Sequence, residues 1–174
     1  MDMFNAARTA TLLGAVSLIA ACTSNDRTVV LDGTPPRMSA AAEGVVPDYC
    51  PRVSLREGTA IMRKGDGPAL QYVASIVSTS RECHVLNGEL RMKVGISGRI
   101  VPGPAVKSGE VGLPIRIVVV QGATVLYSQI GSQAVSLQPG STPTFVYVDS
   151  SVVVPEPSSK DLVIYAGFDE GPQN

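Results

Sequence analysis

Hydrophobic and polar residues alternate along much of this chain, most regularly over residues 89–100. One side of an extended backbone there would carry Leu90, Met92, Val94, Ile96 and Ile100. The other side would carry mostly charged and small polar residues. A period of two over this length predicts a β-strand with one buried face. Asn87-Gly88 just before it suits a tight hairpin turn, so residues 70–81 are expected to form the preceding strand.

Similar short apolar stretches recur to the end of the chain and are separated by glycine, proline and serine. They span residues 50–56, 111–121, 125–130, 135–137, 144–153 and 162–168. No stretch between them has a helical period, which favours a single antiparallel β-sandwich of about seven to eight strands. A small β-barrel is the alternative. The domain resembles the immunoglobulin-like and fibronectin type III classes in length and strand count, but it has no Trp.

The N-terminal part has a different pattern: an uncharged apolar run that stops at Cys22. Arg8 precedes the run, and no charge occurs between Arg8 and Asp26. A run of roughly a dozen residues is typical of a secretory signal and is short for a membrane-spanning helix. The sequence Ile19-Ala-Ala-Cys22 resembles the lipobox of bacterial lipoproteins. That resemblance implies cleavage before Cys22, acylation of Cys22, and a periplasm-facing protein held by membrane lipid; Thr23 favours the outer over the inner membrane.

The pattern therefore divides the chain into four parts. Residues 1–21 are expected to be the lipoprotein signal peptide, and residues 22–48 the lipidated cysteine with a flexible tether. Residues 49–170 would form the sandwich domain, and residues 171–174 a C-terminal tail. The tether is assigned on weak apolar periodicity and on turn-forming residues such as the Pro35-Pro36 pair.

Two cysteines remain once Cys22 is used for the anchor. An even pair in an exported domain suggests a disulfide, so Cys50 and Cys83 are expected to be joined. Such a bond would close a loop of about 33 residues and stabilise the fold by roughly 3–4 kcal/mol on the loop-entropy model. It would also place the first strand beside the end of the second.

The residues offer little for catalysis or for cofactor and metal binding. His84 is the only histidine, and its cysteine neighbours are better used in a disulfide than as zinc ligands. No Gly-x-Ser-x-Gly elbow, phosphate-binding loop or dinucleotide fingerprint is present in the sequence. We therefore expect no enzyme, no cofactor and no metal.

A binding role is the remaining expectation, and the charge pattern indicates one candidate face. Arg91, Lys93 and Arg99 would project from the polar side of residues 89–100, with Lys107 following in the loop of residues 101–114. That loop is either a binding loop or a crossover between sheets. The formal net charge of −1 does not favour binding to nucleic acid. The sequence thus predicts an envelope lipoprotein whose non-catalytic sandwich is a binding or assembly module for another envelope component, with an envelope protein as the expected partner. A lipid- or glycan-binding module is the alternative.

Overall fold

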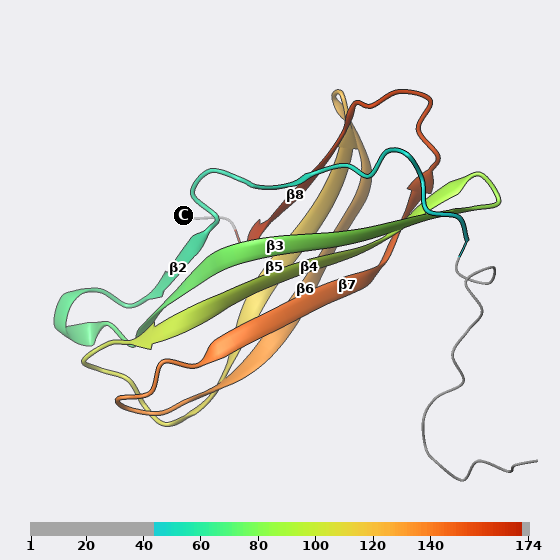
Figure 1. The fold of residues 1–174 in the computed structure, drawn as a ribbon. Coiled ribbons are helices and arrows are strands. Elements are labelled where there is room, and N and C mark those ends of the chain that lie inside the picture. The colour runs from blue at the N-terminus through green and yellow to red at the C-terminus, as the bar shows by residue number, and fades with distance from the viewer. Residues whose placement is uncertain (1–43, 172–174) are drawn as a thin grey trace, which may run out of the picture. The chain divides into compact units, whose positions relative to one another are not determined.

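The computed structural model describes residues 44–171, and they form a sandwich of two four-stranded sheets (Figure 1). The first sheet has the order β2-β3-β4-β7, and the second has the order β1-β8-β5-β6. The strands are β1 (Val53–Leu55), β2 (Ile61–Lys64), β3 (Tyr72–Leu86), β4 (Glu89–Pro102), β5 (Gly109–Gln121), β6 (Thr124–Leu137), β7 (Thr144–Pro155) and β8 (Leu162–Phe168). A single 3-10 turn, Gly67–Ala69, is the only helical element among these residues. The predicted β-sandwich is confirmed, and the barrel alternative is not what forms.

Neighbouring strands are antiparallel except at one edge, where β1 pairs with β8 in parallel. Residues 103–108 connect β4 of one sheet to β5 of the other. The crossover interpretation of this loop is therefore correct, and the segment is shorter than residues 101–114 because both flanking strands extend into it. Asn87 and Gly88 both have positive φ, of 56° and 76°, as the predicted hairpin turn requires.

The core lies between the sheets and contains the predicted inward faces. Leu90, Val94 and Ile100 of β4 are fully buried, as are Ile115 and Ile117 of β5. Burying each such side chain contributes about 1.5–3 kcal/mol relative to leaving it in water. The buried side chains of β8, at Leu162, Ile164, Ala166 and Phe168, are those expected from the alternation.

A β-bulge in β3 explains why the predicted second strand was too short. Ile76 pairs with Gly98 and Ser78 with Ser97, so Val77 is an extra residue without a partner. The inward side chains are even-numbered before the bulge, as at Tyr72, and odd-numbered after it, as at Cys83. A single alternation therefore fits only the first half of a strand that continues to Leu86.

The N-terminal predictions lie mostly outside the described residues. The signal peptide, Cys22 and most of the tether fall there, and so do residues 172–174 of the tail. Within the described part, residues 44–48 approach the domain and Val45 forms an isolated bridge with Val85. No helix in residues 44–171 is long and apolar enough to cross a membrane.

Candidate binding surface

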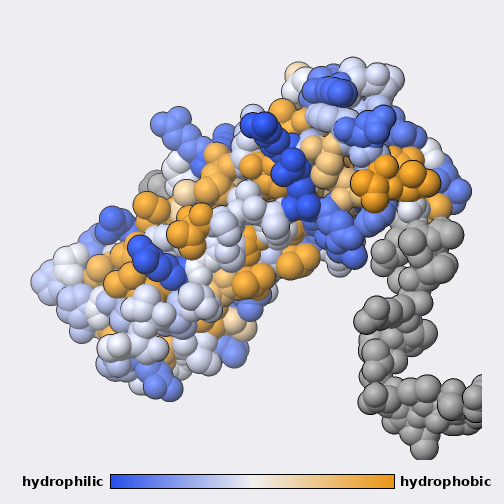
Figure 2. Space-filling model, viewed as in Figure 1, coloured by the Kyte–Doolittle hydropathy of each residue, from blue (hydrophilic) through white to orange (hydrophobic). Residues whose placement is uncertain are grey.

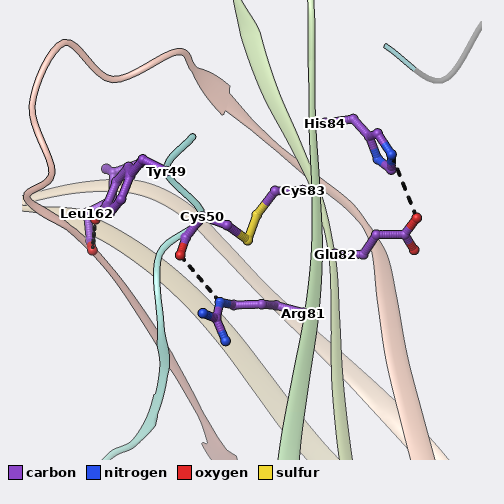
Figure 3. The surroundings of a disulfide bond; sticks show 7 residues. All are labelled: Tyr49, Cys50, Arg81, Glu82, Cys83, His84 and Leu162. Atoms are coloured by element: carbon purple, nitrogen blue, oxygen red, sulfur yellow. Dashed lines mark hydrogen bonds and ion pairs between the residues drawn. A yellow bond between two sulfur atoms is a disulfide. The ribbon is translucent and has the colours of Figure 1, made fainter. Parts of the chain in front are cut away.

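The Cys50–Cys83 disulfide is confirmed, and it fixes one end of the sandwich (Figure 3). It joins the segment before β1 to β3, with the two Cα atoms 5.8 Å apart. Tyr49 supports the same end by donating its hydroxyl to the carbonyl of Leu162, at 2.9 Å, and Arg81 donates Nε to the carbonyl of Cys50. The disulfide therefore links the two sheets, because Cys50 leads into β1 of one sheet and Cys83 lies in β3 of the other.

His84 lies beside the disulfide, and its ring is near the carboxylate of Glu82. Its Nε2 is 3.9 Å from Oε1 of Glu82, and its side chain is 17% exposed. Within residues 44–171 no group of three or more His, Cys, Asp or Glu side chains is placed to hold a metal ion.

The predicted basic residues of β4 do project from the outward face of the β2-β3-β4-β7 sheet. Arg91 and Lys93 are half-exposed, but each contacts a carboxylate. Arg91 Nη2 is 2.7 Å from Glu89 Oε2, and Lys93 Nζ is 3.4 Å from Glu82 Oε2. Exposed pairs of this kind contribute about 0–1 kcal/mol, yet they cancel much of the local charge.

The other two basic residues lie apart from this pair. Arg99 is six positions from Lys93, which is about 20 Å along a strand. It is exposed, and among the described residues it makes no ion pair. Lys107 is in the crossover between the sheets rather than on β4. The structure therefore brings Arg91 and Lys93 together and leaves Arg99 and Lys107 as separate cations.

A strip of small hydroxyl and valine side chains fills the outward face between Lys93 and Arg99. The register sets Ser78 against Ser97 and Ser80 against Gly95, with the Ser78 and Ser97 hydroxyls 2.7 Å apart. On the edge strand β7, Val146 pairs with Ser97 and Val148 with Gly95. We call this set the hydroxyl–valine strip: Val77, Ser78, Ser80, Gly95, Ser97, Val146 and Val148.

The hydroxyl–valine strip exposes apolar surface without any charged side chain of its own. Val77, Val146 and Val148 are 65%, 63% and 53% exposed. Figure 2 shows hydrophobic patches interspersed with weakly polar surface along the elongated face of the domain. Grouped exposed apolar side chains of this kind mark interaction sites more often than isolated ones do. Residue patterning did not reveal the strip, because Val77 is a bulge residue and Val146 and Val148 lie on a different strand.

Two hollows elsewhere on the domain were also missed by sequence reasoning. One, of about 420 Å³, lies beside the disulfide and is lined in part by Arg52, Arg81 and Lys160. These cations are far apart in the sequence, so no local signal groups them.

The second hollow, of about 560 Å³, lies on the outward face of β5 and β8. Its lining includes Val118, Val120 and Tyr165 together with the ion pair of Arg116 and Asp169. The hydrogen bond from Arg116 lowers the pKa of Asp169, with a further contribution from the backbone N–H of Gly171. The hollow is open to the surface, and the buried residues Ala166 and Phe168 also contribute to its lining.

Comparison with known proteins adds no relative. No protein-family model, curated protein or solved structure matches the chain.

Proposed function

We propose that this chain is an envelope lipoprotein, anchored through acylated Cys22, whose sandwich binds another envelope protein without catalysing a reaction. The periplasmic side of the outer membrane is the proposed location. The observation that carries the binding role is the hydroxyl–valine strip on a sheet whose position is fixed by the disulfide and the core. A sheet surface of small side chains suits a protein partner, because it offers contact area and loses little side-chain entropy on binding.

The cations contribute to this proposal unequally. Arg99 borders the hydroxyl–valine strip, two positions from Ser97 on the same face of β4. Arg91 and Lys93 are already held by Glu89 and Glu82. An acidic group on the partner would therefore gain most from Arg99, and removing the paired cations would change recognition little.

The anchor is tested by fatty-acid labelling of the full chain in a bacterial host. Wild type should incorporate label, and Cys22→Ser should not, because the thioether requires the cysteine sulfur. Label retained on Cys22→Ser would contradict the anchor. It would leave the binding proposal untouched, since that proposal rests on residues 44–171.

The binding surface is tested by placing a photoreactive amino acid at Ser97, and at Ser54 of the opposite sheet as the matched control. Ser97 should cross-link an envelope protein in intact cells, and Ser54 should not. Changing Val146 and Val148 to Glu should remove the Ser97 product while far-UV circular dichroism stays unchanged. The same product from both positions, or its persistence in the double variant, would refute this surface.

The charge argument has its own comparison. Arg99→Gln should reduce the cross-linked product, and the reduction should be largest at low ionic strength, where screening is weakest. The double change of Arg91 and Lys93 to Gln serves as the control and should leave the product near the wild-type level. A larger loss in the control than in Arg99→Gln would assign the recognition to the paired cations instead.

The alternative of a lipid- or glycan-binding module would use the hollow on β5 and β8. Its apolar floor and its Arg116–Asp169 pair offer both kinds of contact to a small ligand. A Val118→Asp variant that retains the Ser97 cross-link would show that this hollow is not needed for protein binding.

A further inference from the structure

The two sides of the sandwich differ in how their edge strands are built. On one side the edges are β1 and β2, with three and four residues, and β2 carries Arg63 and Lys64. On the other side the edges are β6 and β7, with 14 and 12 residues. Short strands and cationic side chains are common devices that prevent a sheet edge from pairing with another chain. The β1/β2 side has both devices.

Strand β6 lacks these devices altogether. None of its 14 residues is charged and none is proline. Among the described strands it pairs only with β5, so its other side is unpaired. Its bulge lies near the start, opposite the step from Val119 to Val120, and the ladder from residue 127 to residue 137 is regular. Strand β7, by contrast, has a register shift within its length and carries Asp149.

Two glutamine side chains identify which backbone groups of β6 are not hydrogen-bonded to β5. The amide of Gln129 donates to the carbonyl of Ile130 at 3.4 Å, and that of Gln133 donates to the carbonyl of Ala134 at 3.0 Å. Backbone groups of an antiparallel strand alternate between its two neighbours, so acceptors four residues apart lie on the same side. The even-numbered residues around Ser132 therefore direct their N–H and C=O groups away from β5.

We propose that β6 pairs with β6 of a second copy of this chain, antiparallel and about a two-fold axis at Ser132. This arrangement sets Ile130 against Ala134 of the second copy, so that each glutamine-bound carbonyl receives a backbone N–H instead. Ser128 then lies opposite Ser136 of the second copy. A symmetric strand pair presents the same surface twice, and β6 meets that condition because it has no charges to repel one another.

The side chains along the proposed β6–β6 pairing are small enough for the two strands to come within hydrogen-bonding distance. Ser128, Ser132, Ala134 and Ser136 are small and exposed, and Ile130 is 45% exposed. Pairing over residues 128–136 would be roughly 30 Å long and about one sheet spacing, 10 Å, deep. That is on the order of 300 Å² per copy, well below the roughly 800 Å² of a standard specific interface. The dimer is therefore expected to be weak.

A weak pairing of this kind becomes populated when copies are concentrated. Anchoring through Cys22, which is part of the proposed function, would confine copies to one surface and raise their local concentration. The pairing itself does not depend on the anchor or on the hydroxyl–valine strip, which lies on the other sheet. Both sheets, the core and the disulfide lie within residues 44–171, so a chain of residues 23–174, which lacks the lipidated cysteine, retains all of these elements.

Cysteine cross-linking of that chain at sub-millimolar concentration tests the pairing and its register. With a short thiol-specific cross-linker, Ser132→Cys should give a dimer by itself. Ser128→Cys and Ser136→Cys should each remain monomeric alone and cross-link when mixed with one another. Failure of Ser132→Cys to cross-link, or equal cross-linking of all three single variants, would overturn the proposal.

Sedimentation equilibrium gives an independent measurement without added cysteines. Wild type should show a concentration-dependent monomer–dimer equilibrium, and Ser132→Lys should remain monomeric because it sets two like charges against each other at the axis. Ser54→Lys on β1 is the matched control and should associate as wild type does. A wild-type chain that stays monomeric throughout, or a Ser132→Lys variant that associates equally well, would overturn the proposal.

Discussion

Gly95 and Gly98 occupy the same strand, three residues apart, but alanine should destabilise the fold at Gly98 and have little effect at Gly95. Gly98 faces the core, where an added Cβ would lie 2.5 Å from Cζ of Phe145 and would also collide with the backbone oxygen of Ser75. Phe145 can rotate, but the carbonyl of Ser75 can move only if the sheet moves. We therefore expect Gly98→Ala to cost about 2–3 kcal/mol, in the range of overpacked cores.

Gly95 faces outward within the hydroxyl–valine strip, and its surroundings can adjust. An added Cβ would meet Oγ of Ser80 at 2.5 Å and a methyl group of Val148 at 3.7 Å. A serine hydroxyl moves by one side-chain rotation. Alanine also restricts the unfolded chain more than glycine does, which stabilises the fold by about 0.4–1 kcal/mol. Gly95→Ala should therefore leave the free energy of unfolding within about 0.5 kcal/mol of wild type or raise it slightly.

Urea unfolding followed by far-UV circular dichroism separates the two outcomes. With a denaturant slope of about 2 kcal/mol/M, a loss of 2–3 kcal/mol lowers the midpoint by about 1–1.5 M. Gly98→Ala should show this shift and Gly95→Ala should not. Equal midpoints for the two variants, or a larger loss for Gly95→Ala, would refute the assignment of their faces and contacts.

Two further predictions concern the links between the sheets. Replacing Cys50 and Cys83 together by Ser should lower the free energy of unfolding by roughly 3–4 kcal/mol, the entropy of a 33-residue loop, and a loss below about 1 kcal/mol in urea would contradict that account. Tyr127→Phe removes a 2.7 Å hydrogen bond to the buried Asp149 and should cost about 1–3 kcal/mol. Burial and that hydrogen bond raise the pKa of Tyr127 well above 10, so its contribution should be complete below pH 10 and decline above it. A wild-type stability that is flat above pH 10, or a Tyr127→Phe variant with the same decline, would contradict this.

The alternation of side chains was sufficient to predict the fold class and several strands. Residues 162–168 were predicted with the bounds that β8 has, because that strand is regular throughout. Strand β6 was predicted as two fragments, since polar residues such as Gln129 and Gln133 interrupt its pattern. An edge strand tolerates them because its side chains are only partly covered. Strand β2 was missed because it has four residues, only one of them buried.

The candidate surface was less accessible to sequence reasoning, for reasons of pairing between strands. The basic residues of β4 were correctly placed on an outward face. Their partners were not, because Glu82 reaches Lys93 only through the register of β3 and β4. The parallel pairing of β1 with β8 likewise depends on segments that are far apart in the chain.

The interior of the β6/β7 side shows that its open edge is not a consequence of loose packing. There is no room for a side chain at Gly131 of β6, because Tyr147 of β7 lies against it. The hydroxyl of Tyr127 in β6 donates a hydrogen bond to Asp149 of β7, across the two sheets. These contacts hold the two edges together from inside and leave the outer backbone of β6 exposed. A packed interior together with an uncharged, unpaired edge strand is expected of a sheet that can be extended by another strand. The same side of the domain therefore combines a well-ordered interior with the part of the fold best suited to self-association.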